Sequence, residues 1–170
     1  MKRHRDKYFP LLLLILASMF ALSACVSVSL PKSQGKKASD VVFAAPPSPF
    51  RALPAPQADQ AWVNDGTGNT ISFMSDCAGK ADPSLEQLQA ESLNAMSQLK
   101  VLSDERRPYN ARLAAVSLAE GEVDGIAVKM KVLTLKKNDC NYTLSYTGVR
   151  AGFDRDLAAF ERFVQGFKAP

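Results

Sequence analysis

Apolar residues recur at every second position in several segments of the chain, which is the pattern of half-buried β-strands. The alternation is clearest in residues 140–147, where Cys140, Tyr142, Leu144 and Tyr146 share one face. In residues 126–136 apolar side chains alternate with lysines, as expected for a sheet with one buried and one solvent-exposed face. We predict strands at residues 61–63, 70–74, 101–107, 111–120, from 123 or 126 to 136, and 140–147.

Turn-forming residues separate these strands. Residues 64–69, rich in Asn, Asp and Gly, predict a hairpin between the first two strands. The Asp and Asn oxygens of this segment suggest a calcium loop as an alternative, but the full calcium-loop pattern is missing. Residues 120–125, with two glycines, and Asn138-Asp139 predict two further turns.

Two segments have the spacing of helices with one apolar side. Asp82 and Pro83 are suited to be the N-cap and first residue of a helix that continues to about Lys100. A C-terminal helix is predicted by apolar residues at intervals of three and four, with Asp154 as a candidate cap. The buried faces are Leu85, Leu88, Ser92, Met96 and Leu99 in the first helix, and Phe153, Leu157, Phe160, Val164 and Phe167 in the second. The predicted fold class is α+β, an antiparallel sheet of about five to six strands packed by two helices.

The N-terminus has the organisation of an export signal, in which basic residues precede an apolar run from Leu11 to Leu22. This run is too short to span a membrane, which takes roughly 20 residues. It ends at Leu22-Ser23-Ala24-Cys25, which resembles the bacterial lipoprotein signal. The resemblance implies that residues 1–24 are cleaved off, that Cys25 is diacylated on sulfur and that its freed amine is then acylated. An ordinary secretory signal peptide that happens to contain a cysteine is the alternative.

The residue after Cys25 is Val26, not the Asp that the resemblance associates with retention at the inner membrane. We therefore expect a protein anchored in the outer membrane by its acyl chains, on the periplasmic face or at the cell surface. Three chains hold a protein far more firmly than one, because each buried methylene adds about 0.8 kcal/mol.

Cleavage changes the charge and the chemistry of the chain. The whole sequence has 21 basic residues, 17 acidic residues and one histidine, His4. Residues 1–24 hold four of the basic residues, one acid and His4, so the mature chain keeps 17 basic and 16 acidic residues. Because the mature chain has no histidine, we exclude Ser-His-Asp and Cys-His catalysis. Zinc, copper or haem sites with histidine ligands are excluded for the same reason. A net charge of +1 also removes the case for nucleic-acid binding.

Two cysteines remain besides Cys25. Cys77 and Cys140 both lie on the apolar face of their predicted strands, and an even pair in an oxidising compartment predicts a disulfide. Closing their 63-residue separation stabilises the fold by about 4 kcal/mol in the chain-entropy model. Two buried free thiols are the alternative, and the missing Cys-x-x-Cys spacing argues against a redox-active pair.

Residues 25–60 are rich in Ser, Ala, Pro, Lys and Gln, a composition that resists helices and central strands. They predict a tether between the lipidated cysteine and a single globular domain at residues 61–170. The segment 41–53 has more apolar residues than a free linker needs, so it is expected to lie across the domain. A proline-rich ligand for a partner's groove is the alternative.

The order of elements is hairpin, helix, antiparallel strands and helix, and the last helix carries Phe160-Glu161-Arg162-Phe163-Val164-Gln165-Gly166-Phe167. This order and apolar pattern resemble the Mog1/PsbP-like fold over roughly residues 60–168, and also small proteobacterial lipoproteins. The Cys77/Cys140 pair is not part of the general Mog1/PsbP pattern. The resemblance implies an interaction module on a larger assembly, and it carries over no functional residue.

Candidates for catalysis are few. Neighbouring carboxylates occur at Asp104-Glu105, at Glu120, Glu122 and Asp124, and at Asp154 and Asp156. A glycosidase needs two carboxylates held across a cleft, whereas these lie in predicted turns or helix starts, where solvated acids are common. No Ser-x-x-Lys motif begins a helix, and the sequence has no Gly-rich phosphate loop or haem motif. We therefore expect no enzymatic activity, no cofactor and no metal.

Two surface features are candidates for partner binding. Basic residues on neighbouring strands suit anionic lipid, cell-wall polymer or an acidic partner, and the alternative is an ordinary solvated sheet face with edge-protecting lysines. These residues are Arg106, Arg107, Arg112, Lys129, Lys131, Lys136 and Lys137. The second feature is Tyr109, next to a proline that must lie at a bulge, edge or loop; its side chain is either exposed for a contact or part of the core.

The leading functional hypothesis is a non-enzymatic outer-membrane lipoprotein whose domain docks onto an envelope assembly. A carrier or chaperone for a lipid or small apolar ligand is the second hypothesis, and a pocket of about 300 Å³ favours it. A cell-wall hydrolase that uses Glu120, Glu122 and Asp124 is the third. The expected partners are the membrane, through the acyl chains, and an envelope protein.

Overall fold

The computed structural model describes residues 36–77 and 82–170. The predicted signal peptide, Cys25 and the first part of the tether lie outside the described residues. Within the described residues no helix is both long enough and apolar enough to cross a membrane.

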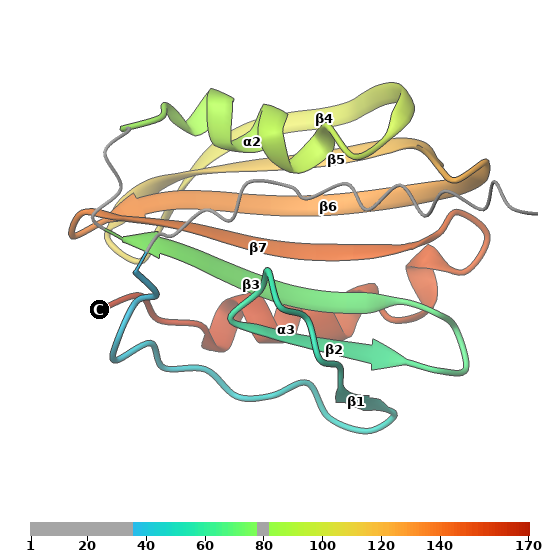
Figure 1. The fold of residues 1–170 in the computed structure, drawn as a ribbon, viewed down its shortest axis with the longest axis horizontal. Coiled ribbons are helices and arrows are strands. Elements are labelled where there is room, and N and C mark those ends of the chain that lie inside the picture. Colours follow the sequence, from blue (N-terminus) through green and yellow to red (C-terminus); the bar gives the residue numbers. More distant parts are fainter. Residues whose placement is uncertain (1–35, 78–81) are drawn as a thin grey trace, which may run out of the picture. The chain divides into compact units, whose positions relative to one another are not determined.

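A seven-stranded sheet, antiparallel at every pairing, forms the centre of the fold (Figure 1). Its strands are β1 (Phe50–Ala52), β2 (Gln60–Asn64), β3 (Thr70–Cys77), β4 (Ser97–Tyr109), β5 (Arg112–Val123), β6 (Ile126–Lys137) and β7 (Cys140–Val149), in the spatial order β1-β2-β3-β7-β6-β5-β4. The predicted α+β class is confirmed, with more strands than expected because β1 forms within the predicted tether and pairs with β2.

Three hairpins close with two-residue turns in which both residues have positive φ: Asn110-Ala111, Asp124-Gly125 and Asn138-Asp139. Turns of this kind follow the twist of the flanking strands, and Asn, Asp and Gly tolerate their conformation best. The turn predicted over residues 120–125 is shorter, because β5 continues to Val123. Gly121 is therefore a strand residue, and a Cβ there would lie 2.7 Å from the Ser97 carbonyl oxygen of β4.

Helix α2 (Leu85–Leu93) begins and ends at other residues than predicted. Its N-cap is Ser84, not Asp82: the Gln87 backbone N–H donates to Ser84 Oγ at 3.2 Å, and the Ser84 N–H donates to Gln87 Oε1 at 2.8 Å. The predicted continuation to Lys100 is wrong, because the chain from Ser97 onward pairs with β5 as the start of β4. Strand pairing at this point outweighs a helical spacing of apolar residues.

The two helices lie on opposite faces of the sheet (Figure 1). Helix α3 (Leu157–Gly166), preceded by one turn of 3₁₀ helix, η2 (Phe153–Arg155), covers the larger core and confirms the predicted C-terminal helix. Its N-cap is Asp156 and not Asp154. Helix α2 packs over β5 and β6 on a smaller core of Leu93, Met96, Ala119, Val128 and Val132. The expectation of one fully solvent-exposed face is therefore wrong where α2 covers it.

Residues 36–43, here called the strap, are built into the domain. Lys36 bridges to Cys77 of β3, and Val42 exchanges two backbone hydrogen bonds with Lys168, of 3.1 and 2.8 Å. The Phe43 ring lies 4.9 Å from the Phe73 ring and 5.8 Å from the Trp62 ring, between centroids. The chain that leads from Cys25 therefore joins the hydrophobic core before the globular domain predicted from the sequence begins.

Candidate functional site

The face of the sheet that carries α2 has a groove of about 310 Å³ beside the helix. Its floor is formed by β3, β7 and β6, where Ser72 Oγ and Ser145 Oγ share a hydrogen bond of 2.7 Å. Ser92 of α2 lines one part of it, and Leu53 and Ala58 of the β1–β2 loop line another. We call this space the α2-face groove.

The lining of the α2-face groove carries no charged side chain. It consists of Leu53, Ala55, Gln57, Ala58, Ala61, Thr70, Ser72, Met74, Ser92, Met130, Thr143 and Ser145. Two flexible methionines lie among small residues, and methionine adapts to ligands of irregular shape. The groove can hold an uncharged, mainly apolar molecule or part of one.

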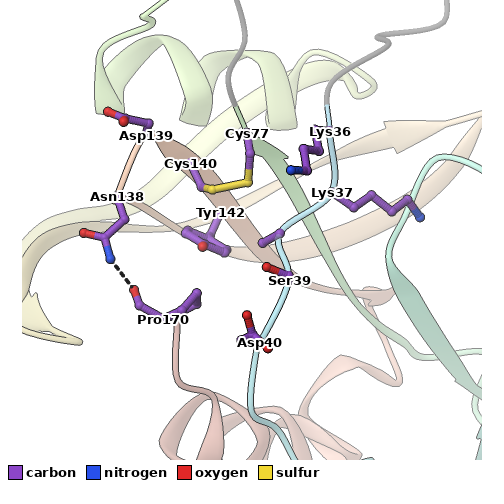
Figure 2. Close-up of a pocket in the computed structure, with 11 residues that line it drawn as sticks. Lys36, Lys37, Ser39, Asp40, Cys77, Asn138, Asp139, Cys140, Tyr142 and Pro170 are labelled. Atoms are coloured by element: carbon purple, nitrogen blue, oxygen red, sulfur yellow. Dashed lines mark hydrogen bonds between the residues drawn. A yellow bond between two sulfur atoms is a disulfide. The ribbon is translucent and has the colours of Figure 1, made fainter.

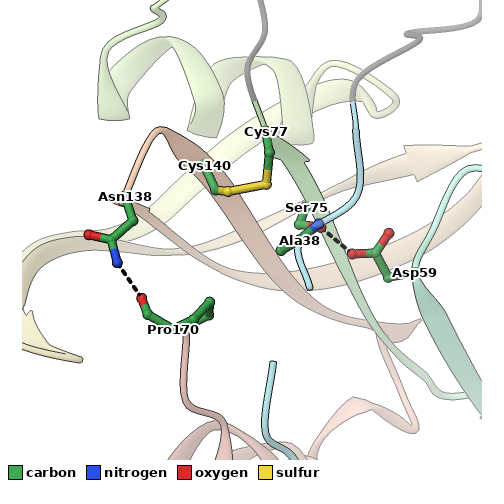
Figure 3. Close-up of a disulfide and its surroundings, with 7 residues drawn as sticks. All are labelled: Ala38, Asp59, Ser75, Cys77, Asn138, Cys140 and Pro170. Atoms are coloured by element: carbon green, nitrogen blue, oxygen red, sulfur yellow. Dashed lines mark hydrogen bonds between the residues drawn. A yellow bond between two sulfur atoms is a disulfide. The ribbon is translucent and has the colours of Figure 1, made fainter. Parts of the chain in front are cut away.

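Cys77 and Cys140 are direct partners across β3 and β7 and form a disulfide, which confirms that prediction (Figure 3). The strap is attached next to it, because the Cys77 backbone N–H donates to the Lys36 carbonyl oxygen at 2.8 Å and the Ala38 N–H donates to Ser75 Oγ at 2.8 Å. Ser75 Oγ in turn donates to Asp59. The disulfide thus fixes the two central strands where the strap enters the fold.

Beside the disulfide is a second space of about 270 Å³, here called the disulfide cleft (Figure 2). The strap forms one wall, and the β6–β7 turn with Pro170 forms the other, where Asn138 Nδ2 donates to the Pro170 carbonyl oxygen at 2.9 Å. Tyr142 lies at the base. Its side chain is fully buried, and its hydroxyl has no hydrogen-bond partner among the described residues. Burial, followed by the charge of Asp59, raises the pKa of Tyr142 above its ordinary value.

The basic residues predicted to form one stripe lie on both faces of the sheet. Arg106 is on the α2 side and pairs with Glu86 at 2.9 Å and with Asp104 at 2.7 Å. Lys131 is on the α3 side and contacts Glu161 at 2.5 Å, and Lys129 Nζ lies 5.8 Å from the Phe153 ring centroid.

The remaining basic residues are also spread out. Arg107 and Arg112 lie near the β4–β5 turn, and Arg107 is level with Leu135 of β6. Leu135 is four positions from Lys131, so Arg107 lies about 13 Å from Lys131 along the strand direction. Lys136 contacts Asp82, and Lys137 Nζ donates to the Ala169 carbonyl oxygen at 2.8 Å. The geometry brings Lys129 and Lys131 together on one face but does not join the set into one stripe.

The Tyr109 side chain is half-buried and forms hydrogen bonds at the end of α3. Its hydroxyl donates to the Val164 carbonyl oxygen at 2.6 Å and lies 3.2 Å from that of Phe167. Burial raises the pKa of Tyr109 to about 12. This side chain therefore fixes the end of α3 against the β4–β5 turn.

Several of the carboxylates considered for catalysis contact other groups of the protein. Asp104 pairs with Arg106, and Glu120 lies 3.6 Å from Lys100 and 3.8 Å from Arg150. Glu122 accepts a hydrogen bond of 2.9 Å from the Gln98 side chain. Within residues 36–77 and 82–170 no three acidic, Cys or His side chains are grouped in a way that could hold a metal ion.

Asp156 is the centre of a polar cluster that the sequence patterns did not reveal. Its carboxylate accepts hydrogen bonds from Asn64 Nδ2 at 3.0 and 3.1 Å, from Thr67 Oγ1 at 2.6 Å and from Asn69 Nδ2 at 2.8 Å. The β2–β3 loop considered as a calcium site therefore directs N–H and O–H donors at a carboxylate. The available signal was the density of Asn and Thr in the loop, but nothing local identifies Asp156 as their acceptor.

No protein-family model and no curated protein matches the chain. Solved structures do resemble it. One is LpqN, involved in cell envelope biogenesis of Mycobacterium tuberculosis, with a TM-score of 0.57, 14% identity, and coverage of 81% of this chain and 86% of that one. Another is the cyanobacterial PsbP of Synechocystis, with a TM-score of 0.53, 13% identity, and coverage of 88% and 99%. A Mog1 protein has a TM-score of 0.54, 12% identity, and coverage of 78% and 94%. At these identities the likeness concerns the fold, and it confirms the predicted Mog1/PsbP-like architecture.

Proposed function

We propose that this chain is a lipid-anchored accessory module of the bacterial cell envelope that acts by binding, without catalysis. The observation that carries the proposal is the strap. Three kinds of contact fix it to the domain: the bridge from Lys36 to Cys77, the bond from Ala38 to Ser75 and the pairing of Val42 with Lys168.

The strap determines how far the domain can lie from its anchor. Eleven residue steps separate Cys25 from Lys36, so the connection spans at most about 40 Å at roughly 3.5 Å per residue. A domain on so short a connection works close to the membrane that holds Cys25. The description of the similarly folded LpqN as a protein of cell envelope biogenesis supports the same setting.

Cys25→Ala in the full chain, expressed in a bacterial host, tests the anchor. We expect the wild-type chain in the outer-membrane fraction, and the variant absent from that fraction with its signal unprocessed, because the variant has no acylation site. Val26→Ala is the matched control and should fractionate as the wild type does. A processed Cys25→Ala chain that still fractionates with the outer membrane would contradict the lipoprotein proposal.

Crosslinking in intact cells tests the binding role. We expect the wild-type chain to yield a defined envelope protein, and Cys25→Ala to lose it because the domain is no longer held at the outer membrane. Lys129→Glu and Arg112→Glu then test the α3 side, with Arg106→Glu as the matched exchange on the opposite face. Undiminished capture by Lys129→Glu and Arg112→Glu would show that these basic residues do not contact the partner.

The α2-face groove favours a second function, as a carrier of a lipid or small apolar ligand. At about 310 Å³ it has the size expected for that role, and the residues that line it carry no charge. A water takes about 30 Å³ of liquid, so the groove has room for about ten groups of that size.

Binding of a fluorescent fatty acid to the full chain in detergent tests the carrier. Ala58→Trp places a large side chain at the rim of the groove, so it should weaken binding at least about tenfold. Ala158→Trp on the exposed side of α3 is the matched control and should leave binding unchanged. Equal affinity of the two variants would exclude the groove as the binding site.

A further inference from the structure

The Tyr142 hydroxyl is a buried polar group without a partner in the part of the chain that the structure describes. The side chain is 0% exposed, and within residues 36–77 and 82–170 its hydroxyl neither donates nor accepts a hydrogen bond. Leaving such a group unsatisfied costs roughly 1–3 kcal/mol, and most buried polar groups in folded proteins therefore have a partner. Because burial raises the pKa of Tyr142, the phenol keeps its proton at neutral pH and offers an O–H donor. A hydrogen-bond acceptor would therefore satisfy this hydroxyl.

The disulfide cleft next to Tyr142 has room for more than one water. Its volume of about 270 Å³ corresponds to about nine groups of the size of a water. Figure 2 shows Tyr142 at its base, between the disulfide and the strap, with the β6–β7 turn opposite the strap. A ligand of about nine non-hydrogen atoms fits a space of this size.

The two lysines of the strap, Lys36 and Lys37, extend in different directions. In Figure 2 the Lys36 ammonium extends toward the disulfide, whereas Lys37 extends away from the cleft. Lys37 Nζ donates to the Ala58 carbonyl oxygen at 2.8 Å and lies 3.3 Å from Asp59 Oδ1, so its charge is used outside the cleft. The end of the cleft near the disulfide therefore combines a cation with the Tyr142 O–H donor.

The other end of the strap wall carries a negative charge. Asp40 lines the cleft and has a φ of 63°, the left-handed conformation that Asp tolerates better than most residues. Asp139 also lines the cleft, from the β6–β7 turn, and its carboxylate points outward in Figure 2. A ligand that complements both ends carries a carboxylate toward Lys36 and Tyr142 and an ammonium group toward Asp40.

We propose that the disulfide cleft binds a small zwitterion of amino-acid to dipeptide size, with its carboxylate on the Tyr142 hydroxyl and the Lys36 ammonium and its amine on the Asp40 carboxylate. This site is separate from the α2-face groove and does not depend on the lipid anchor. It would place recognition of a small peptide-like ligand where the strap enters the domain.

Isothermal titration calorimetry of the full chain in detergent, with L-alanyl-L-alanine and L-alanine as probes, tests the site. We expect saturable binding of at least one probe and none of N-acetyl-alanine amide, which is smaller than the dipeptide and carries neither charge. Tyr142→Phe removes only the hydroxyl, and it should weaken binding roughly tenfold to a hundredfold, the range for losing a hydrogen bond to a charged group. Asp40→Asn should weaken binding of the dipeptide as well.

Tyr109→Phe is the matched control, because it removes a tyrosine hydroxyl outside the cleft and should leave the affinity unchanged. Thermal unfolding gives a second measurement: Tyr142→Phe should leave the midpoint of the ligand-free chain unchanged or higher, since its hydroxyl has no bond to lose. The proposal would be overturned if neither probe binds. It would also be overturned if Tyr142→Phe and the wild type bind the probe with equal affinity. A lower midpoint for ligand-free Tyr142→Phe would also overturn it, because the hydroxyl would then already have a hydrogen-bond partner in the ligand-free chain.

Discussion

Replacing Asp156 with Ala should remove the acceptor that connects the β2–β3 loop to the start of α3. Three side chains of the loop donate to this carboxylate, and they respond differently to its loss. Asn69 Nδ2 keeps a second bond to the Gly152 carbonyl oxygen at 3.0 Å, and the half-buried Thr67 can turn to water. Asn64, only 4% exposed, keeps no partner for its amide N–H groups.

The expected loss of unfolding free energy for Asp156→Ala is about 3 kcal/mol. One buried unpaired donor costs roughly 1–3 kcal/mol, and hydrogen bonds to a charged acceptor contribute roughly 1.5–3 kcal/mol each. Such a loss is a large fraction of the 5–15 kcal/mol that is typical of a folded domain.

Urea unfolding followed by the fluorescence of Trp62, the only tryptophan of the chain, measures this loss. Trp62 is 5% exposed in the larger core, so its emission reports global unfolding. Asp154→Ala is the matched control, because Asp154 is an exposed acid two residues away, and its change should stay within about 0.5 kcal/mol. If Asp156→Ala and Asp154→Ala have the same midpoint, the cluster does not stabilise the fold and the reasoning is refuted.

Three further changes have defined outcomes. Gly148→Ala places a Cβ 1.9 Å from Asn69 Oδ1, so it should lower the free energy of unfolding in urea by about 3 kcal/mol. In an Asn69→Ala background the same change should lower it much less, and an equal loss in both backgrounds would exclude this clash. Because burial raises the pKa of Tyr109 to about 12 from its ordinary 10, its contribution to stability is complete below pH 10 and is lost as the pH rises through 12. The thermal midpoint of Tyr109→Phe should therefore fall less steeply over this range than that of the wild type, and parallel curves would contradict the shift. Replacing Cys77 and Cys140 with Ser should lower the unfolding free energy by about 4 kcal/mol for the 63-residue separation, whereas an unchanged urea midpoint would show that the bond adds no stability.

The predicted end of the first helix, at Lys100, is wrong, and it shows what the spacing of apolar residues within one segment does not determine. Met96 and Leu99 continue the helical spacing of Leu85 and Leu88, so the sequence favours a helix to Lys100. In the structure the chain from Ser97 onward instead pairs with β5. The two residues of each pair are at most 25 positions apart in the sequence. A spacing of apolar residues does not reveal such a partner, since pairing depends on the neighbouring strand.

The positions of the basic residues follow in part from the alternation of side chains along a strand. Arg106 and Arg107 are adjacent in a strand, and successive side chains of a strand point to opposite faces. Alternation alone therefore excludes one stripe that contains both. The ion pairs of Arg106 with Glu86 and of Lys131 with Glu161 needed the tertiary structure, because each joins a strand to a helix.

By itself the sequence determined the order of the elements, the α+β class, the C-terminal helix and the strands that bring Cys77 and Cys140 onto one face. These features depend on residue type and on spacing within one element, so they are local. Only the tertiary structure decided that the strap joins the domain from Lys36 onward, that Asp156 accepts from the β2–β3 loop and that Tyr142 lacks a partner among the described residues beside the disulfide cleft. Each of these depends on groups far apart in the chain, whose contacts are set by strand register and helix packing.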